Sequence, residues 1–91
     1  MNRTVFLNAD QLMDAEEAQQ YLEHSFMFPS WYGRNLDALH DCLCDIHENT
    51  EIIIEGAVSS ERKKATYLDR IIRVMDDCAD ENSCIHVFLK D

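Results

Sequence analysis

Four acidic residues recur at the spacing of helical turns in the middle of this chain. They are Asp37, Asp41, Asp45 and Glu48. If residues 36–48 form a helix, these side chains share an arc of about 80°, because each residue advances about 100°. Carboxylates at i and i+4 repel one another and destabilise a helix by about 0.2–0.5 kcal/mol per pair. The face is either an ordinary solvated surface or a surface that meets a cation, with Trp31 and Tyr32 as contact aromatics.

Metal ligands recur along the same stretch and open a different interpretation. His40, Cys44 and His47 stand at i, i+4 and i+7, with Asp37 or Asp41 close by. This spacing can direct imidazole and thiolate groups toward one zinc ion. The alternative is that Cys44 and His47 are ordinary half-buried side chains without a metal, because both also border the apolar face of the helix. We therefore expect no metal or other cofactor, and a zinc-binding module stays an alternative.

An aromatic loop leads into this predicted helix. Pro29 fixes its own φ angle and discourages helix at Phe28, while Gly33 permits a backbone turn. Asn35 is a favourable N-cap. The helix that follows has one apolar stripe and is expected to end near residues 47–49; the stripe consists of Leu36, Leu39, Leu43 and Ile46.

The rest of the chain alternates between strand and helix patterns. Residues 3–8 read as a first strand, and Asp14 caps a helix that runs to about Phe26. The apolar run 52–54 indicates a strand covered on both faces, which ends at Gly56. The last helix follows a Ser59 or Ser60 cap and ends at Asn82 or Ser83, and its inner positions are Leu68, Ile71, Ile72, Met75, Cys78 and Ala79.

Residues 84–89 form the last predicted strand, so the order is β-α-α-β-α-β. Helical crossovers of this length favour parallel strands. The sequence therefore predicts an α/β fold in which three to four helices pack on a three-stranded parallel sheet.

The run from Pro29 to Leu43, Pro-Ser-Trp-Tyr-Gly-Arg-Asn-Leu-Asp-Ala-Leu-His-Asp-Cys-Leu, resembles the signature of the barstar family of ribonuclease inhibitors. That family typically reads Pro-x-Tyr-Tyr-Gly-x-Asn-Leu-Asp-Ala-Leu-Trp-Asp-Cys-Leu. The resemblance implies the same α/β architecture, with a further short helix after the second strand. The segment 57–66 is slightly short for that helix here.

The resemblance also implies a mechanism, in which carboxylates occupy the phosphate site of a ribonuclease. Asp41 would fill the phosphate pocket, Asp37 would contact neighbouring basic groups, and Trp31 would stack near the active-site histidine. Asp77 would make a peripheral acidic contact, and Asp45 would act mainly on the association rate. The implied partner-binding residues are Trp31, Tyr32, Gly33, Asn35, Asp37, Ala38, His40, Asp41, Asp45 and Asp77.

Three of these residues depart from the family pattern. Trp31 replaces the usual tyrosine, which removes a hydroxyl but keeps a large stacking surface. His40 replaces tryptophan, and Asp77 is one methylene shorter than the usual glutamate. A diverged ribonuclease or a toxin nuclease domain therefore fits as well as a close barnase relative.

The length and net charge of the chain limit the number of domains and the classes of partner that are possible. Ninety-one residues make one small domain, 1–91, and the net charge of −10 opposes direct binding to nucleic acid or to an anionic membrane. The same charge favours a basic protein partner, bound one to one. The chain lacks the apolar run of a signal peptide or membrane helix, so we expect a cytoplasmic protein with four reduced cysteines. The sequence contains no phosphate loop and no nucleophile–base motif, so we expect neither an enzyme nor an obligate small-molecule ligand. The main competing function is that of an adaptor for another basic protein.

Overall fold

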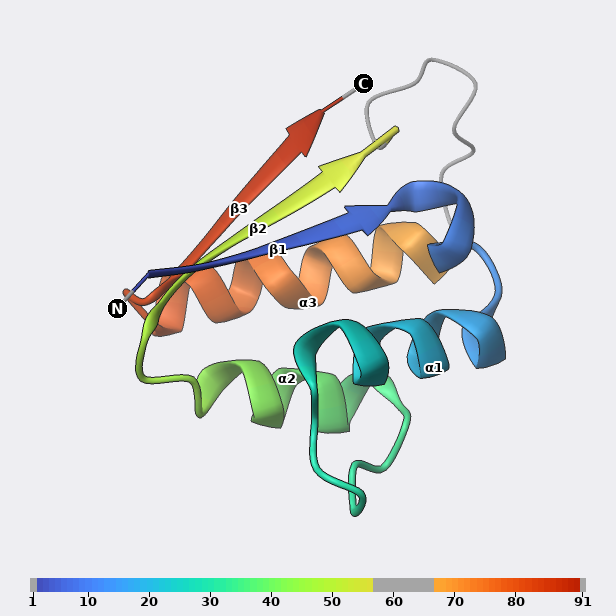
Figure 1. The fold of residues 1–91 in the computed structure, drawn as a ribbon, viewed down its shortest axis with the longest axis horizontal. Coiled ribbons are helices and arrows are strands. Elements are labelled where there is room, and N and C mark those ends of the chain that lie inside the picture. The colour runs from blue at the N-terminus through green and yellow to red at the C-terminus, as the bar shows by residue number, and fades with distance from the viewer. Residues whose placement is uncertain (1, 57–66, 91) are drawn as a thin grey trace.

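The computed structural model describes residues 2–56 and 67–90 and contains a three-stranded sheet with three α-helices (Figure 1). In chain order the elements are β1 (Asn2–Asn8), the 3-10 helix η1 (Ala9–Leu12), α1 (Ala15–Phe26), α2 (Leu36–Cys44), β2 (Asn49–Glu55), α3 (Tyr67–Glu81) and β3 (Ile85–Lys90). The strands are all parallel and lie in the order β1-β2-β3. The predicted fold class and sheet are thus confirmed. The predicted Ser59 or Ser60 cap and the further short helix fall in 57–66, outside the described residues.

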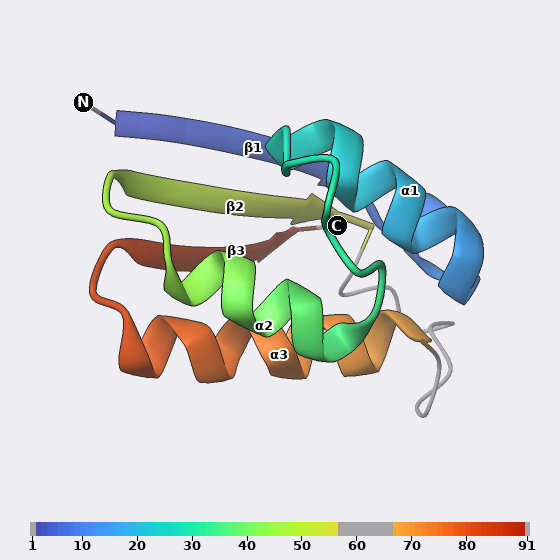
Figure 2. The ribbon, with the colours of Figure 1, turned by 90° about the horizontal axis from the view of Figure 1, so that it is seen from below.

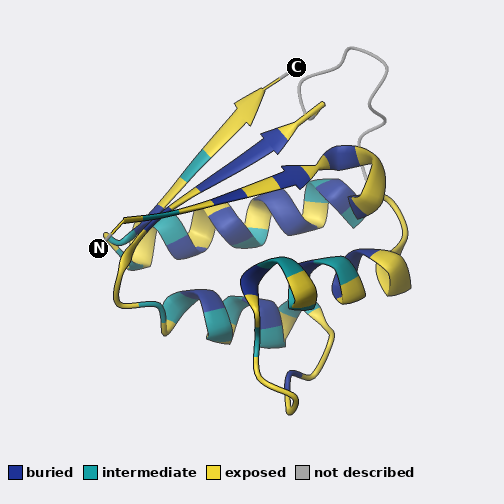
Figure 3. Ribbon diagram, in the orientation of Figure 1, coloured by how far each residue is buried: buried dark blue, intermediate teal, exposed yellow. Residues whose placement is uncertain are grey.

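The helices lie together on one face of the sheet (Figures 1 and 2). Strand side chains alternate between the two faces, so Val5 and Leu7 of β1 point to the helices and are buried beside Ile52 and Ile54 of β2. The helices contribute most of the rest of this core (Figure 3), including Leu22, Phe26, Leu39, Leu43, Leu68, Ile71 and Met75. Among the described residues, no helix has the length and apolar character needed to span a membrane.

The other face of the sheet differs from the prediction of a strand covered on both sides. Phe6, Ile53 and Phe88 are register partners across the three strands. Both phenylalanines are exposed, and no described helix packs over them. Ile53 is only 9% exposed because it lies between the two rings. The apolar run 52–54 is therefore explained by the central position of β2 in the sheet. It does not indicate a second layer of helices among the described residues.

Two of the predicted helix starts, Asp14 and Asn35, are confirmed by their capping bonds. The Asp14 carboxylate accepts a hydrogen bond from the Glu17 N–H at 3.1 Å, and the Asn35 side-chain oxygen accepts one from the Ala38 N–H at 2.7 Å. Each bond satisfies an N–H that has no partner within its helix. α1 ends at Phe26, and its C-cap Met27 has a left-handed conformation with φ of 58°. The chain there leaves the helix abruptly and enters the aromatic loop.

Candidate functional site

The loop between α1 and α2 has a small aromatic core of its own. The rings of Phe26 and Phe28 stack with centroids 5.2 Å apart, and the Phe28 and Tyr32 rings lie 4.7 Å apart. The Tyr32 N–H donates to the Pro29 carbonyl at 2.9 Å and closes a turn. These contacts fix the path of the loop and leave the Trp31 side chain pointing outward, with 77% of its surface exposed.

Tyr32 differs from the prediction of a contact aromatic, because it is only 5% exposed. Its hydroxyl donates to the Gln19 side-chain oxygen, and the Gln19 amide donates to the Tyr67 hydroxyl at 2.6 Å. Burial raises the pKa of Tyr32 well above its ordinary value, so the phenol remains a neutral donor. Tyr32 therefore anchors the loop to α1 and α3. Gln19 could not be recognised from the sequence as a core residue, because a polar residue in an amphipathic helix is ordinarily assigned to the surface.

The role of Gly33 also differs from the prediction of a backbone turn. The residue with positive φ is its neighbour Arg34, at 55°. A Cβ atom on Gly33 would lie 3.4 Å from both the Ala38 Cβ and the Asn35 side-chain nitrogen. Gly33 thus lies close to the first turn of α2, where an added methyl group would just touch Ala38 and Asn35. The Arg34 Nε donates to Glu23 at 2.7 Å, and this hydrogen bond raises the Arg34 pKa.

Three carboxylates form what we call the acidic ridge: Asp37, Asp41 and Asp45. All three are exposed, and the side chains of Asp41 and Asp45 keep 86% and 87% of their surface. Two arginines approach other acids: Arg3 lies 3.8 Å from Glu48, and Arg34 bonds to Glu23. Within 2–56 and 67–90, no lysine or arginine nitrogen lies within 4.0 Å of a ridge carboxylate. The ridge is therefore accessible to an external cation.

Among residues 2–56 and 67–90, the basic side chains nearest to the ridge are histidines. The His40 Nδ1 lies 3.9 Å from an Asp41 oxygen, and the His47 Nε2 lies 3.8 Å from Asp45. Both separations exceed a hydrogen bond. The nearby Cys42 thiol has a raised pKa, first because it is partly buried and then because Asp41 and Asp45 oppose a second negative charge.

α2 ends earlier than predicted, at Cys44 rather than near residues 47–49. The Asn82 side-chain amide, which follows α3, donates to the carbonyls of Leu43 at 3.2 Å, Cys44 at 3.3 Å and Ile46 at 2.9 Å. These bonds satisfy carbonyls that a longer helix would have paired internally. The predicted four-acid face is consequently wrong in part. Asp45 is the C-cap, and Glu48 lies beyond the helix beside Arg3.

Asn82→Ala is expected to destabilise the chain by about 1–3 kcal/mol, because the carbonyls at the end of α2 and the Cys84 N–H lose their partner. Urea denaturation measures the change. Ser83→Ala alters the exposed neighbour and is expected to stay within about 0.5 kcal/mol of wild type. Equal stability of the two variants would contradict this role for Asn82.

An open groove runs between the aromatic loop, α2 and the start of β1. Six of the ten predicted partner-binding residues line it: Trp31, Gly33, Ala38, His40, Asp41 and Asp45. The remaining four lie elsewhere: Tyr32 is in the core, Asn35 caps α2, Asp37 is exposed in its first turn, and Asp77 is exposed on α3. The acid that α3 contributes to the groove is Glu81, which the sequence analysis did not single out.

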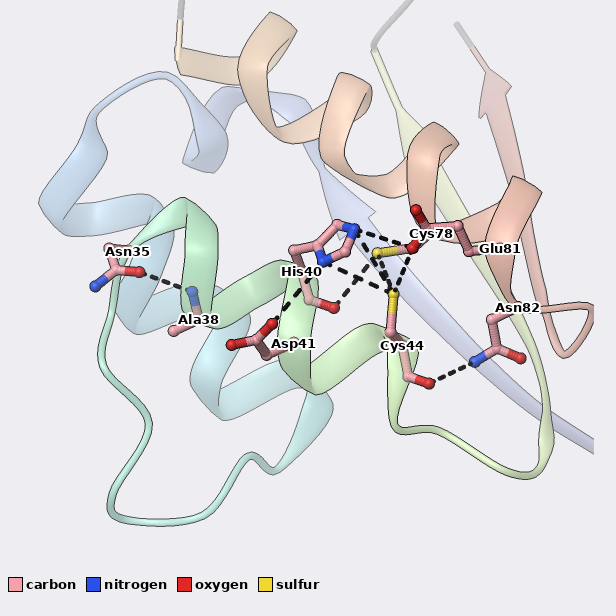
Figure 4. Close-up of polar contacts among 8 residues, drawn as sticks. All are labelled: Asn35, Ala38, His40, Asp41, Cys44, Cys78, Glu81 and Asn82. Atoms are coloured by element: carbon pink, nitrogen blue, oxygen red, sulfur yellow. Dashed lines mark hydrogen bonds and ion pairs between the residues drawn. The ribbon is translucent and has the colours of Figure 1, made fainter.

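The predicted zinc ligands are only partly brought together (Figure 4). The His40 ring and the Cys44 sulfur lie 3.8 Å apart, but the third ligand-type side chain at this point is Cys78 of α3. The side chain of His47 is 90% exposed, on a segment that has left the helix. The spacing along one helix could not reveal Cys78, because the contact joins residues far apart in sequence.

Comparison with known proteins agrees with this architecture. Residues 2–90 match the family model described as "Barstar (barnase inhibitor)". The chain is also 26% identical over 80 residues to a Bacillus subtilis protein named "Putative ribonuclease inhibitor YrdF", covering 87% of this chain and 88% of that one. Since the match extends from the first strand through the acidic helix to the last strand, the chain belongs to the Barstar (barnase inhibitor) family.

Proposed function

We propose that this chain inhibits a basic ribonuclease, of the barnase or toxin type, by placing ridge carboxylates where the phosphates of RNA bind. The observation that carries the proposal is the exposure of Asp41 and Asp45 with no described lysine or arginine beside them. Family membership and the name of the Bacillus subtilis relative support ribonuclease inhibition. The chain itself performs no chemistry in this proposal.

The chemistry of a ribonuclease site explains why carboxylates suit this task. Arg, Lys and His side chains that hold a phosphate also accept a carboxylate, which forms paired hydrogen bonds with guanidinium and a charged pair with imidazolium. Asp41 lies in the groove and would enter the phosphate pocket, while Asp37 would contact basic groups at its rim. Asp45, Asp77 and the net charge of −10 would mainly accelerate association.

The aromatic loop would supply apolar contact beside this charged centre. Trp31 would stack on the nuclease near its active-site histidine, next to His40 in the groove. Tyr32, Gly33 and Asn35 would act indirectly, by holding the loop and the first turn of α2 in place. The free cysteines suit a reducing compartment, so we place the complex in the cytoplasm. One inhibitor would bind one nuclease, and the complex would contain no nucleic acid.

An inhibition titration tests the proposal. Purified chain is added to barnase and, separately, to any secreted or toxin-type ribonuclease encoded beside this chain, while RNA cleavage is followed. We expect cleavage by at least one of them to fall to zero at one chain per nuclease. If neither enzyme is inhibited by a large molar excess, and neither binds in calorimetry, the proposal fails.

Trp31→Ala is expected to weaken nuclease binding by about 2 kcal/mol or more, as truncation of a tryptophan at the centre of an interface commonly does. The melting temperature should stay close to wild type because the ring is exposed. Phe6→Ala is the matched control, since it removes an exposed aromatic from the opposite side of the sheet. Equal affinities of the two variants, measured by calorimetry, would exclude Trp31 from the interface.

A further inference from the structure

Four side chains that bind metals in other proteins converge between α2 and α3 (Figure 4). His40 and Cys44 lie one turn apart on α2, and Cys78 and Glu81 lie one turn apart on α3. One ligand atom each from His40, Cys44 and Cys78 lies within 4.8 Å of the other two. A Glu81 oxygen lies beside two of them, 3.3 Å from the His40 Nε2 and 3.5 Å from the Cys44 sulfur.

Four separations among these ligand atoms are close to those of a tetrahedral metal site. Zinc binds sulfur at about 2.3 Å and nitrogen or oxygen at about 2.0–2.2 Å, so neighbouring ligand atoms in a tetrahedron lie about 3.3–3.8 Å apart. The observed separations are 3.3 Å between nitrogen and oxygen, 3.4 Å between the two sulfurs, 3.5 Å between sulfur and oxygen, and 3.8 Å between sulfur and nitrogen. These four separations fall within that range, and Cys78 lies within 4.8 Å of His40, so the ligand atoms need only small side-chain movements to surround one ion.

The environment suits a structural metal site. Cys78 is fully buried, Cys44 and His40 are half-buried, and Glu81 is exposed. Burial raises the pKa of both thiols, so they are protonated in the metal-free chain. Binding of one divalent cation would release both thiol protons and leave two thiolates, one imidazole and one carboxylate around it.

We propose that His40, Cys44, Cys78 and Glu81 form a binding site for one thiophilic divalent cation, such as Zn²⁺, that links α2 to α3. The inference rests on the geometry of these two helices and does not depend on the proposed inhibition of a ribonuclease. A cation bound there would stabilise the folded state by mass action, because the unfolded chain does not hold the four ligands together. It would also fix the position of His40 at the edge of the groove.

Metal titration of the reduced chain, carrying no affinity tag, tests the site. We expect one Zn²⁺ per chain by calorimetry and a rise in melting temperature. With Co²⁺ as the probe we expect the intense ligand-field bands of a tetrahedral site and a thiolate charge-transfer band. Replacing a ligand should weaken Zn²⁺ binding more than about 10-fold, since even residues behind a metal ligand contribute that much. His40→Gln and Cys44→Ser alter half-buried residues, and circular dichroism checks that both variants fold.

The matched controls are His47→Gln and Cys84→Ser, which remove the same side-chain types outside the cluster. Both should bind Zn²⁺ as wild type does. The proposal is overturned if the wild-type affinity equals that of Cys44→Ser, or if His47→Gln loses as much affinity as His40→Gln. It is equally overturned if the Co²⁺ complex lacks thiolate charge transfer, or if Cys44 and Cys78 form a disulfide in air while the reduced chain binds no ion.

Discussion

Replacing Asp41 by alanine is expected to weaken binding to the inhibited ribonuclease by about 2–5 kcal/mol, the usual cost of removing one partner of a buried charge pair. Barnase and barstar are themselves a reference complex for this range. In the complex the cations of the nuclease pocket would lose their counter-charge and remain desolvated. Dissociation rates from stopped-flow or surface measurements should carry most of the change.

The same substitution should leave the free chain as stable as before, or slightly more stable. Asp41 lies one turn from both Asp37 and Asp45, and each repulsive pair costs a helix about 0.2–0.5 kcal/mol. Asp10→Ala is the matched control, since it changes the net charge equally but lies in η1, outside the groove. Equal loss of affinity in the two variants would mean that only overall charge matters.

Leu39→Ala is expected to lower the free energy of unfolding by about 2–5 kcal/mol, through lost burial and the cavity it leaves. Leu39 is fully buried on the side of α2 that packs into the core, behind the acidic ridge. Domains of this size often have only about 5–15 kcal/mol in total, so the variant would lose a large part of its stability. A lower urea midpoint with an unchanged m-value is the expected signature.

Leu89→Ala provides the control, because this leucine of β3 is already 37% exposed and should cost much less. If the two leucine variants unfolded at the same urea concentration, the position of α2 on the core would be wrong. The acidic ridge would then lack the rigid support that the proposed mechanism requires.

Local patterns sufficed to predict most of the fold. The helix caps at Asp14 and Asn35, the apolar positions of α3 and the order of strands and helices are properties of neighbouring residues, and all are confirmed. The end of α2 was predicted wrongly because the residue that ends it, Asn82, lies after α3. Nothing near Cys44 in the sequence marks that boundary.

The exposure of individual site residues could be predicted from the sequence where it follows from local spacing. It could not be predicted where it depends on tertiary contacts. Asp41 and Trp31 are exposed as expected for contact residues. Tyr32 is adjacent to Trp31 in sequence but is buried, because the Gln19 side chain, itself bonded to Tyr67, offers its hydroxyl a partner in the core. Two further contacts likewise depend on how α2 and α3 pack. The Cys44 and Cys78 thiols lie in contact, and Glu81 lies beside His40.

The central claim is that ridge carboxylates occupy the same pocket as a phosphate of RNA, and competition with inorganic phosphate tests it most directly. Phosphate is small enough to block that pocket without covering the surrounding surface. At constant ionic strength, the apparent dissociation constant of the inhibitor–nuclease complex should rise linearly with phosphate concentration, and Asp41→Ala should abolish this dependence. A dissociation constant that stays the same at saturating phosphate would contradict the account.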